Sequence, residues 1–142
     1  MNEEVNKDQE IVSDKKVVNN ELVKNKEEVK VDDRVYATID DFIKIEIKVG
    51  TVISATVVEG ADKLYVLQVD LNEEKPRQIL SGIREYVSVD DLIGKQFPFI
   101  TNLAPRMLRG HESQGMILAG SDENGLALFN PSKPLINGTR LR

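Results

Sequence analysis

The sequence predicts an all-β domain with one short helix, preceded by a charged N-terminal tail. Three observations support this prediction. Residues 1–37 contain no Gly and no Pro, whereas from Thr38 onward short β-branched runs are separated by turn residues. Apolar and polar residues alternate in several of these runs, as in Ile45–Val49. Apolar residues make up 40% of the 142 residues, and no window reaches the roughly 18 apolar residues of a membrane span, so a membrane protein is not expected.

The tail, residues 1–37, mixes 7 basic and 10 acidic residues, a net charge of −3 out of −5 for the whole chain. Its apolar residues are few, and their spacing hints at a helical stripe: Val5, Val12, Val18, Leu22 and Val29. So little apolar surface does not offset the entropy of ordering the chain. The sequence therefore predicts a disordered or transiently helical tail, with a helix that folds against a partner as the alternative, and a folded domain over residues 38–142.

The domain begins with a helix of one or two turns, because Thr38 and Asp41 have the spacing of a capping box. Gly50 is expected to kink or bulge the first strand. Pro98, which has no N–H group, predicts that its strand lies at an edge or a bulge. Ser88 opens a second short helix that Gly94 can close. The strands are predicted at 45–58, 64–71, 77–83, 96–101 and 116–119, the second helix at 89–93, a loop at 102–112, and a strand extension in the C-terminal tail.

Three strands, one small helix and two further strands is the order of elements in an OB-fold barrel. A jelly roll needs more strands, and a βαβ fold needs longer helices. The fold class predicted from the residues is therefore a five-stranded OB-fold barrel with a C-terminal strand extension.

Catalysis by this chain alone is not expected. There is no Cys, and His111 is the single histidine, so a metal centre or a nucleophile activated by paired imidazoles has no ligands. Phosphate-binding loops, dinucleotide-binding glycine motifs and nucleophile elbows are absent from the sequence. The sequence predicts no cofactor and no metal.

Binding is better supported than catalysis. The segment 75–111 holds six Lys and Arg residues against three Asp and Glu residues, a net charge of +3 in an acidic chain. Arg106 and Arg109 lie three apart, close to Asn102, and guanidinium groups match the oxygens of phosphate. A solvated loop with two arginines is the alternative.

Five ordered blocks carry a family resemblance: Asp62–Leu64, Ser81–Arg84, Gly94–Lys95, Asn102–Met107 and Glu112–Ala119. With these blocks, residues 39–142 resemble the tRNA-binding domain family. That family includes the C-terminal domain of methionyl-tRNA synthetases and free-standing dimeric tRNA-binding proteins.

The resemblance implies an OB-fold that binds tRNA by shape and through backbone phosphates, as a homodimer and without catalysis. The expected partners are tRNA and a second copy, with a separate aminoacyl-tRNA synthetase chain as a further possibility, in the cytoplasm and in protein biosynthesis. If Met1 is the natural start, the chain is a free-standing protein or a separate β subunit. A protein-interaction or chaperone-like module that docks onto a synthetase or binds peptides is the competing reading.

By motif position, the resemblance places eight residues on the RNA-binding face: Lys48, Lys63, Ser81, Arg84, Asn102, Arg106, Ser113 and Met116. Each has a structural alternative. Lys48 and Lys63 could be solvated surface residues, Ser81 could satisfy a backbone group at a strand end, and Met116 could fill the core.

Overall fold

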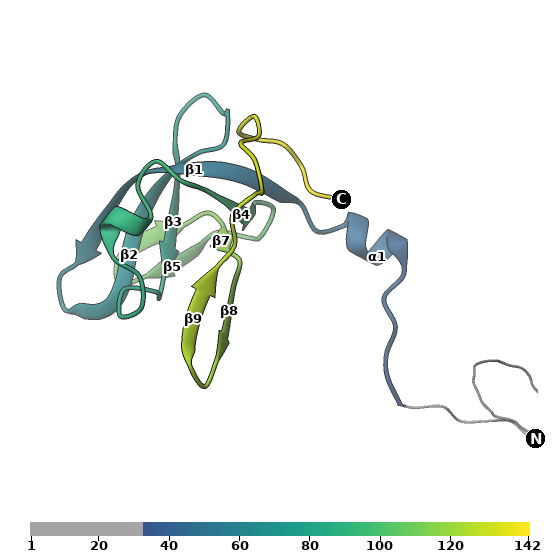
Figure 1. Ribbon diagram of the computed structural model, residues 1–142, viewed down its shortest axis with the longest axis horizontal. Helices are drawn as coiled ribbons and strands as arrows, with labels where there is room; N and C mark the ends of the chain where they lie inside the picture. Colours follow the sequence, from purple (N-terminus) through teal and green to yellow (C-terminus); the bar gives the residue numbers. More distant parts are fainter. Residues whose placement is uncertain (1–32) are drawn as a thin grey trace, which may run out of the picture. The chain divides into compact units, whose positions relative to one another are not determined.

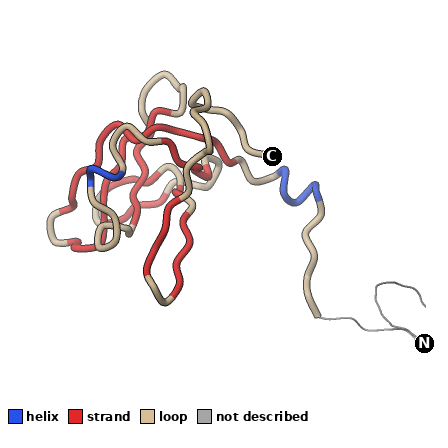
Figure 2. Tube along the Cα trace, viewed as in Figure 1, coloured by secondary structure: helices blue, strands red, loops and turns tan. Residues whose placement is uncertain are grey.

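The computed structural model describes residues 33–142, and the contacts divide the chain into Met1–Ala37 and Thr38–Arg142. The prediction of a disordered or transiently helical tail falls largely on residues 1–32, outside the described residues. Nearly all regular elements of the second unit are strands, joined by loops (Figures 1 and 2). Its elements are α1 (Ile39–Ile43), β1 (Ile47–Val58), β2 (Ala61–Asp70), β3 (Arg77–Ser81), the 3-10 turn η2 (Val89–Asp91), β4 (Gln96–Ile100), β5 (Arg106–Leu108), β6 (His111–Ser113), β7 (Met116–Ile117), β8 (Ala119–Asp122) and β9 (Gly125–Leu128).

The predicted capping box is confirmed at the start of α1. The Thr38 hydroxyl accepts a hydrogen bond from the Asp41 backbone N–H (3.2 Å), and the Asp41 carboxylate accepts one from the Thr38 N–H (2.9 Å). None of the five residues of α1 is buried, so packing against the sheet does not stabilise this helix.

Five strands form one antiparallel sheet in the order β3-β2-β1-β4-β7, which confirms the predicted all-β fold with five main strands. The long strand β1 organises the sheet, because residues 47–51 pair with β4 and residues 51–58 pair with β2. The expected kink does not fall at Gly50: β1 continues through this residue, and the register shifts between Val52 and Ser54 instead. Phe97, Phe99, Leu67 and Ile79 are among the fully buried side chains between the strands.

The two outer strands of this sheet, β3 and β7, approach each other through residues 112–115. Gln114 donates its backbone N–H to the Gln78 carbonyl (2.8 Å), and Gln78 Nε2 donates to the Glu112 carbonyl (2.9 Å). These contacts join the two edges without forming a continuous strand ladder.

Pro98 was expected at an edge or a bulge, and the edge is not observed, because β4 lies between β1 and β7. Pro98 is tolerated because β7 is only two residues long and pairs with Phe99 and Ile100, so its ladder ends before Pro98. The Pro98 carbonyl still accepts a hydrogen bond from the Leu118 N–H (3.1 Å).

The segment predicted as a loop, 102–112, contains a β-hairpin formed by β5 and β6. Its two-residue turn is Arg109-Gly110, and both residues have positive φ, 51° and 82°. The predicted helix at 89–93 is a 3-10 turn, closed by Gly94 at φ 79° as expected.

The C-terminal strand extension lies along β1. The Thr139 carbonyl accepts from the Val49 N–H (2.9 Å), and the Leu141 N–H donates to the Ile47 carbonyl (2.8 Å). These groups of the tail are therefore already bonded within the chain and are not available to pair with a second subunit.

Within residues 33–142, no helix combines the length and the apolar character that crossing a membrane requires.

Gly115 allows the close approach that brings residues 112–115 between β3 and β4. A Cβ atom there would lie 2.8 Å from the Ile100 carbonyl oxygen and 2.9 Å from Ile79 Cδ1. We therefore expect Gly115→Ala to lower the free energy of unfolding by about 1–3 kcal/mol, measured by urea denaturation. Gly82→Ala is the matched control, because the nearest atom to its Cβ would be 3.9 Å away. Equal losses in both variants would contradict this assignment.

Candidate nucleic-acid interface

Three of the predicted binding residues lie where β2 and β3 meet the following loop. Ser81 pairs with Tyr65 at the end of β3. Arg84 donates its backbone N–H to the Lys63 carbonyl (3.2 Å) and its Nη1 to the Ala61 carbonyl (3.3 Å). Lys63 is exposed, whereas part of the Arg84 hydrogen-bonding capacity is already used to hold the loop.

Ser113 and Arg106 face each other across the β5-β6 hairpin. Ser113 is buried, and its hydroxyl accepts from the Leu80 N–H (3.0 Å) and donates to the Gly115 carbonyl (3.1 Å). This hydroxyl therefore fastens the hairpin to β3. Arg106 is exposed, and its guanidinium has no hydrogen-bond or ion-pair partner in the described part of the chain.

Asn102 holds the segment that connects α1 to β1. Its Oδ1 accepts from the Glu46 N–H (2.8 Å), and its Nδ2 donates to the Lys44 carbonyl (2.7 Å). An amide group carries two N–H donors, so one Asn102 N–H is left over for a phosphate or a base.

Lys48 lies beside this junction, in β1, and forms an ion pair with Glu46 (3.6 Å between Nζ and Oε1). A hydrogen bond from the Thr101 hydroxyl (2.6 Å) lowers the pKa of Glu46, and the positive charges of Lys48 and Arg140 lower this pKa further. Glu46 is therefore ionised at neutral pH and offsets part of the Lys48 charge.

Met116 lies in β7 opposite Ile100 and is 43% exposed, so it is not part of the core. A flexible thioether on the surface can pack against a ribose or a base.

The eight predicted residues form two groups at opposite ends of β3. One group surrounds Ser81, because Ser113 binds the neighbouring Leu80 and Arg106 is opposite Ser113. The other group lies near Thr101, whose carbonyl accepts a hydrogen bond from the side chain of Arg77. Arg77 begins β3 and Ser81 ends it, so their Cα atoms are about 13 Å apart. The first group contains Lys63, Ser81, Arg84, Arg106 and Ser113, and the second contains Lys48, Asn102 and Met116.

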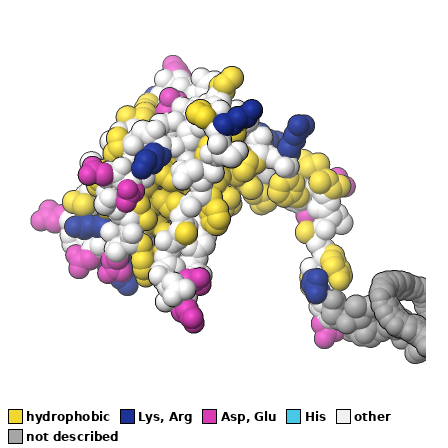
Figure 3. All heavy atoms as spheres, viewed as in Figure 1, with side chains coloured by type: hydrophobic (Ala, Val, Ile, Leu, Met, Phe, Trp, Pro, Cys, Tyr) yellow, Lys and Arg dark blue, Asp and Glu magenta, His cyan; other side chains and the backbone are white. Residues whose placement is uncertain are grey.

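Acidic side chains are interspersed with the basic ones on the face drawn in Figure 3. The dark blue Lys and Arg side chains stand apart there, and magenta Asp and Glu side chains lie between them. On this face, no single basic patch is visible.

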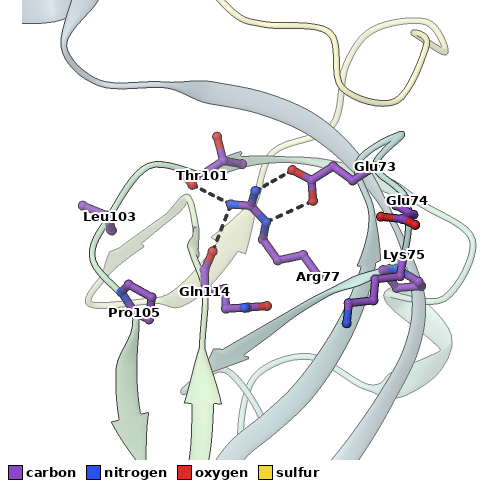
Figure 4. A pocket seen from close by; sticks show the side chains of 9 residues that line it. Glu73, Glu74, Lys75, Arg77, Thr101, Leu103, Pro105 and Gln114 are labelled. Carbon is purple, nitrogen blue, oxygen red and sulfur yellow. Dashed lines mark hydrogen bonds and ion pairs between the residues drawn. The ribbon is translucent and has the colours of Figure 1, made fainter.

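Arg77 contributed to the positive charge counted in the sequence, but four of the five N–H donors of its guanidinium are engaged. It lies in a groove and contacts both carboxylate oxygens of Glu73 and the carbonyls of Thr101 and Gln114 (Figure 4). Arg77 therefore ties the β2-β3 loop to the segments after β4 and β6, and Glu73 offsets its charge.

Two exposed residues of the β5-β6 hairpin were not included among the eight. Arg109 occupies the hairpin turn, and Met107 is 66% exposed on the strand before it. The signal for this hairpin in the sequence is Gly110, since glycine is favoured at the second position of a two-residue turn with positive φ.

Within residues 33–142, no cluster of three His, Cys, Asp or Glu side chains is arranged to hold a metal ion.

Comparison with known proteins identifies the family. Residues 47–140 match the model of the putative tRNA-binding domain. The chain belongs to this tRNA-binding domain family.

The similar proteins are methionine–tRNA ligases and small proteins of the same fold. Over 105 residues, 74% of this chain, it is 50% identical to methionine–tRNA ligase 1 of Bacillus cereus and 47% identical to methionine–tRNA ligase of Methanocella arvoryzae. The chain spans only about a sixth of the length of these ligases, 16% and 15%.

Among solved structures, a MetRS-related protein from Pyrococcus horikoshii superposes with a TM-score of 0.71 at 34% identity, over 77% of this chain and 100% of that one. The chaperone CsaA from Bacillus anthracis superposes with a TM-score of 0.68 at 27% identity, over 76% of this chain and 100% of that one.

Because both heteroatoms of the Asn102 amide bind the backbone, we expect Asn102→Ala to destabilise the domain. The expected loss in the free energy of unfolding is about 1 kcal/mol, since water can replace part of these exposed hydrogen bonds. Urea denaturation measures this loss. Arg106→Ala is the control and should change stability by less than about 0.5 kcal/mol. If Asn102→Ala left stability unchanged, the structural role of Asn102 would be wrong.

Proposed function

We propose that the folded unit binds tRNA through backbone phosphates and shape, and catalyses no reaction by itself. The observation that carries this proposal is the guanidinium of Arg106, which has no partner among residues 33–142 and lies on a hairpin anchored to β3, in a chain of the tRNA-binding domain family. Cationic side chains that neutralise phosphates release bound counterions, and this release drives binding without reading the base sequence. Double-stranded RNA is recognised largely by its shape.

The proposed contact set has two kinds of member. Lys63, Arg106 and Met116 are exposed and can touch RNA directly. The others act partly through the positions they hold, because their polar atoms are bonded within the chain or lie in a strand: Lys48, Ser81, Arg84, Asn102 and Ser113.

For the whole protein we propose an accessory role in protein biosynthesis in the cytoplasm. The chain would deliver or retain tRNA as a free-standing protein, or as the β subunit or appendage of a methionyl-tRNA synthetase. The similarity to methionine–tRNA ligases supports this role.

Removing the Arg106 charge should weaken tRNA binding in a way that depends on salt. We expect Arg106→Ala to weaken binding to all tRNAs by a similar factor, and to reduce the slope of log affinity against log salt by about one. Fluorescence anisotropy of labelled tRNA at several salt concentrations measures both quantities. Arg106→Lys is the matched control and should retain the slope. Loss of binding to one tRNA species alone would contradict contact with the backbone.

We also propose that the protein forms a homodimer through α1. This helix has five residues and no buried side chain, and Ile39, Phe42 and Ile43 are 69%, 41% and 55% exposed. Arg140 and Asn102 nevertheless fix its C-terminal end, because they donate to the carbonyls of Ile43 (2.7 Å) and Lys44 (2.7 Å). Burial against a second copy would cover this apolar face and stabilise a helix too short to be stable in isolation.

Sedimentation of the full chain at micromolar concentration tests the dimer. We expect a dimer for the unmodified protein and a monomer for Phe42→Glu, since a carboxylate would be buried in the interface. Lys133→Glu, a change of charge away from α1, should leave the dimer intact. A monomer for the unmodified protein would exclude the homodimer. A synthetase chain retained in a pull-down after ribonuclease treatment would instead support the competing reading, docking of this module onto a protein partner.

A further inference from the structure

The β5-β6 hairpin holds an arginine in a backbone conformation that arginine rarely adopts. Leu108 pairs with His111, so the turn consists of Arg109 and Gly110 alone. Their φ values, 51° and 82°, are both positive, as in a type I′ turn, whose first position favours Asn, Asp or Gly. A left-handed conformation brings the Cβ of Arg109 too close to the following carbonyl oxygen, so this residue lowers the stability of the turn.

The turn cannot relax this strain, because the hairpin is fastened on both sides. Leu108, immediately before the turn, packs against the cluster formed by Val58, Ala61, Val66 and Leu80. On the other strand, the Glu112 carbonyl accepts from Gln78 Nε2 (2.9 Å), and the Ser113 hydroxyl accepts from the Leu80 N–H (3.0 Å). The register that places Arg109 at the turn is therefore fixed by packing and hydrogen bonds outside the turn.

Among residues 33–142, no contact of the Arg109 guanidinium offsets this strain. Three other arginines of the folded unit donate to backbone carbonyls: Arg77 to Thr101 and Gln114, Arg84 to Ala61, and Arg140 to Ile43 and Ile45. In contrast, Arg109 is exposed, and its guanidinium has no partner within the described residues. A strained residue whose side chain stabilises nothing locally points to a role in binding.

The charge around the turn suits an anion. The segment 102–113 contains Arg106 and Arg109 against one carboxylate, Glu112, which lies opposite Met107 on β6. Arg106 lies on β5 of the same hairpin, so both free guanidinium groups project from one rigid ribbon. Guanidinium groups form strong, paired hydrogen bonds with phosphate oxygens.

We propose that Arg109 is a phosphate-binding residue at the tip of the β5-β6 hairpin, and that the domain tolerates its unfavourable backbone conformation because the guanidinium contacts the RNA backbone. This inference rests on the proposed tRNA binding and extends it to a residue outside the set of eight. It makes opposite predictions for stability and for binding at the same position.

Arg109→Asn tests both predictions in the full chain. Asn adopts positive φ readily, so we expect the melting temperature to rise by about 3–6 °C. The same change removes the charge, so affinity for labelled unfractionated tRNA should fall roughly 3- to 10-fold at moderate salt, and the salt slope should decrease by about one.

Two control variants separate charge from conformation. Arg109→Lys keeps both the charge and the unfavourable φ, so the melting temperature should stay within about 1 °C and the affinity within about threefold. Lys133→Asn removes one positive charge from an exposed residue elsewhere in the unit, and should weaken binding less than Arg109→Asn does.

Each result has a defined meaning. If Arg109→Asn binds tRNA as tightly as the unmodified protein does, or if Lys133→Asn weakens binding equally, Arg109 is not a phosphate-binding site. If Arg109→Asn lowers the melting temperature, the turn is not strained by arginine. If the unmodified protein fails to bind tRNA at low salt, the proposed function itself is wrong, and this inference fails with it.

Discussion

The hydrogen bonds between β3 and residues 112–115 are the constraint on which the rest of the structure depends. They join the two outer strands of the sheet, and they fix the β5-β6 hairpin against β3. Ser113 contributes to this junction with a buried hydroxyl, and Gly115 contributes by lacking a side chain where the Ile100 carbonyl and Ile79 are close. Because the hairpin cannot shift, Arg106 and Arg109 are presented to solvent at defined positions, which lowers the entropic cost of contacting a ligand.

The arginines divide according to what their guanidinium groups touch. Arg77, Arg84 and Arg140 each tie together segments that are distant in the sequence by donating to backbone carbonyls. Arg106 and Arg109 are exposed, and their guanidinium groups have no partner in the described part of the chain. Net charge along the sequence does not distinguish these two kinds of arginine, although only the second kind can neutralise phosphates. An acidic chain can therefore bind a polyanion, because the available charges matter more than the total.

The fold could be predicted from the sequence to a large extent, because its signals are local. The capping box of Thr38 and Asp41, the turn residues between strands, and the alternation in β1 each reflect interactions over a few residues. The predictions failed where a residue's environment depends on a segment that is distant in the sequence. Pro98 is tolerated in an inner strand because the β7 ladder ends before it. The C-terminal tail bonds to β1, which is distant in the sequence. The hairpin at 106–113 was missed because its strands have only three residues each, too few for a periodic pattern.

The sequence by itself determined the family, the order of the five main strands along the chain, the absence of cysteine, and the polar and basic residue types available for binding RNA, because these follow from residue identity and short-range spacing. Only the tertiary structure decided what those side chains do. Asn102 and Ser113 bond to backbone groups of segments more than 30 residues away, 56 and 33 positions along the chain. Such contacts form when the folded sheet brings those segments together, so residue spacing in the sequence does not predict them.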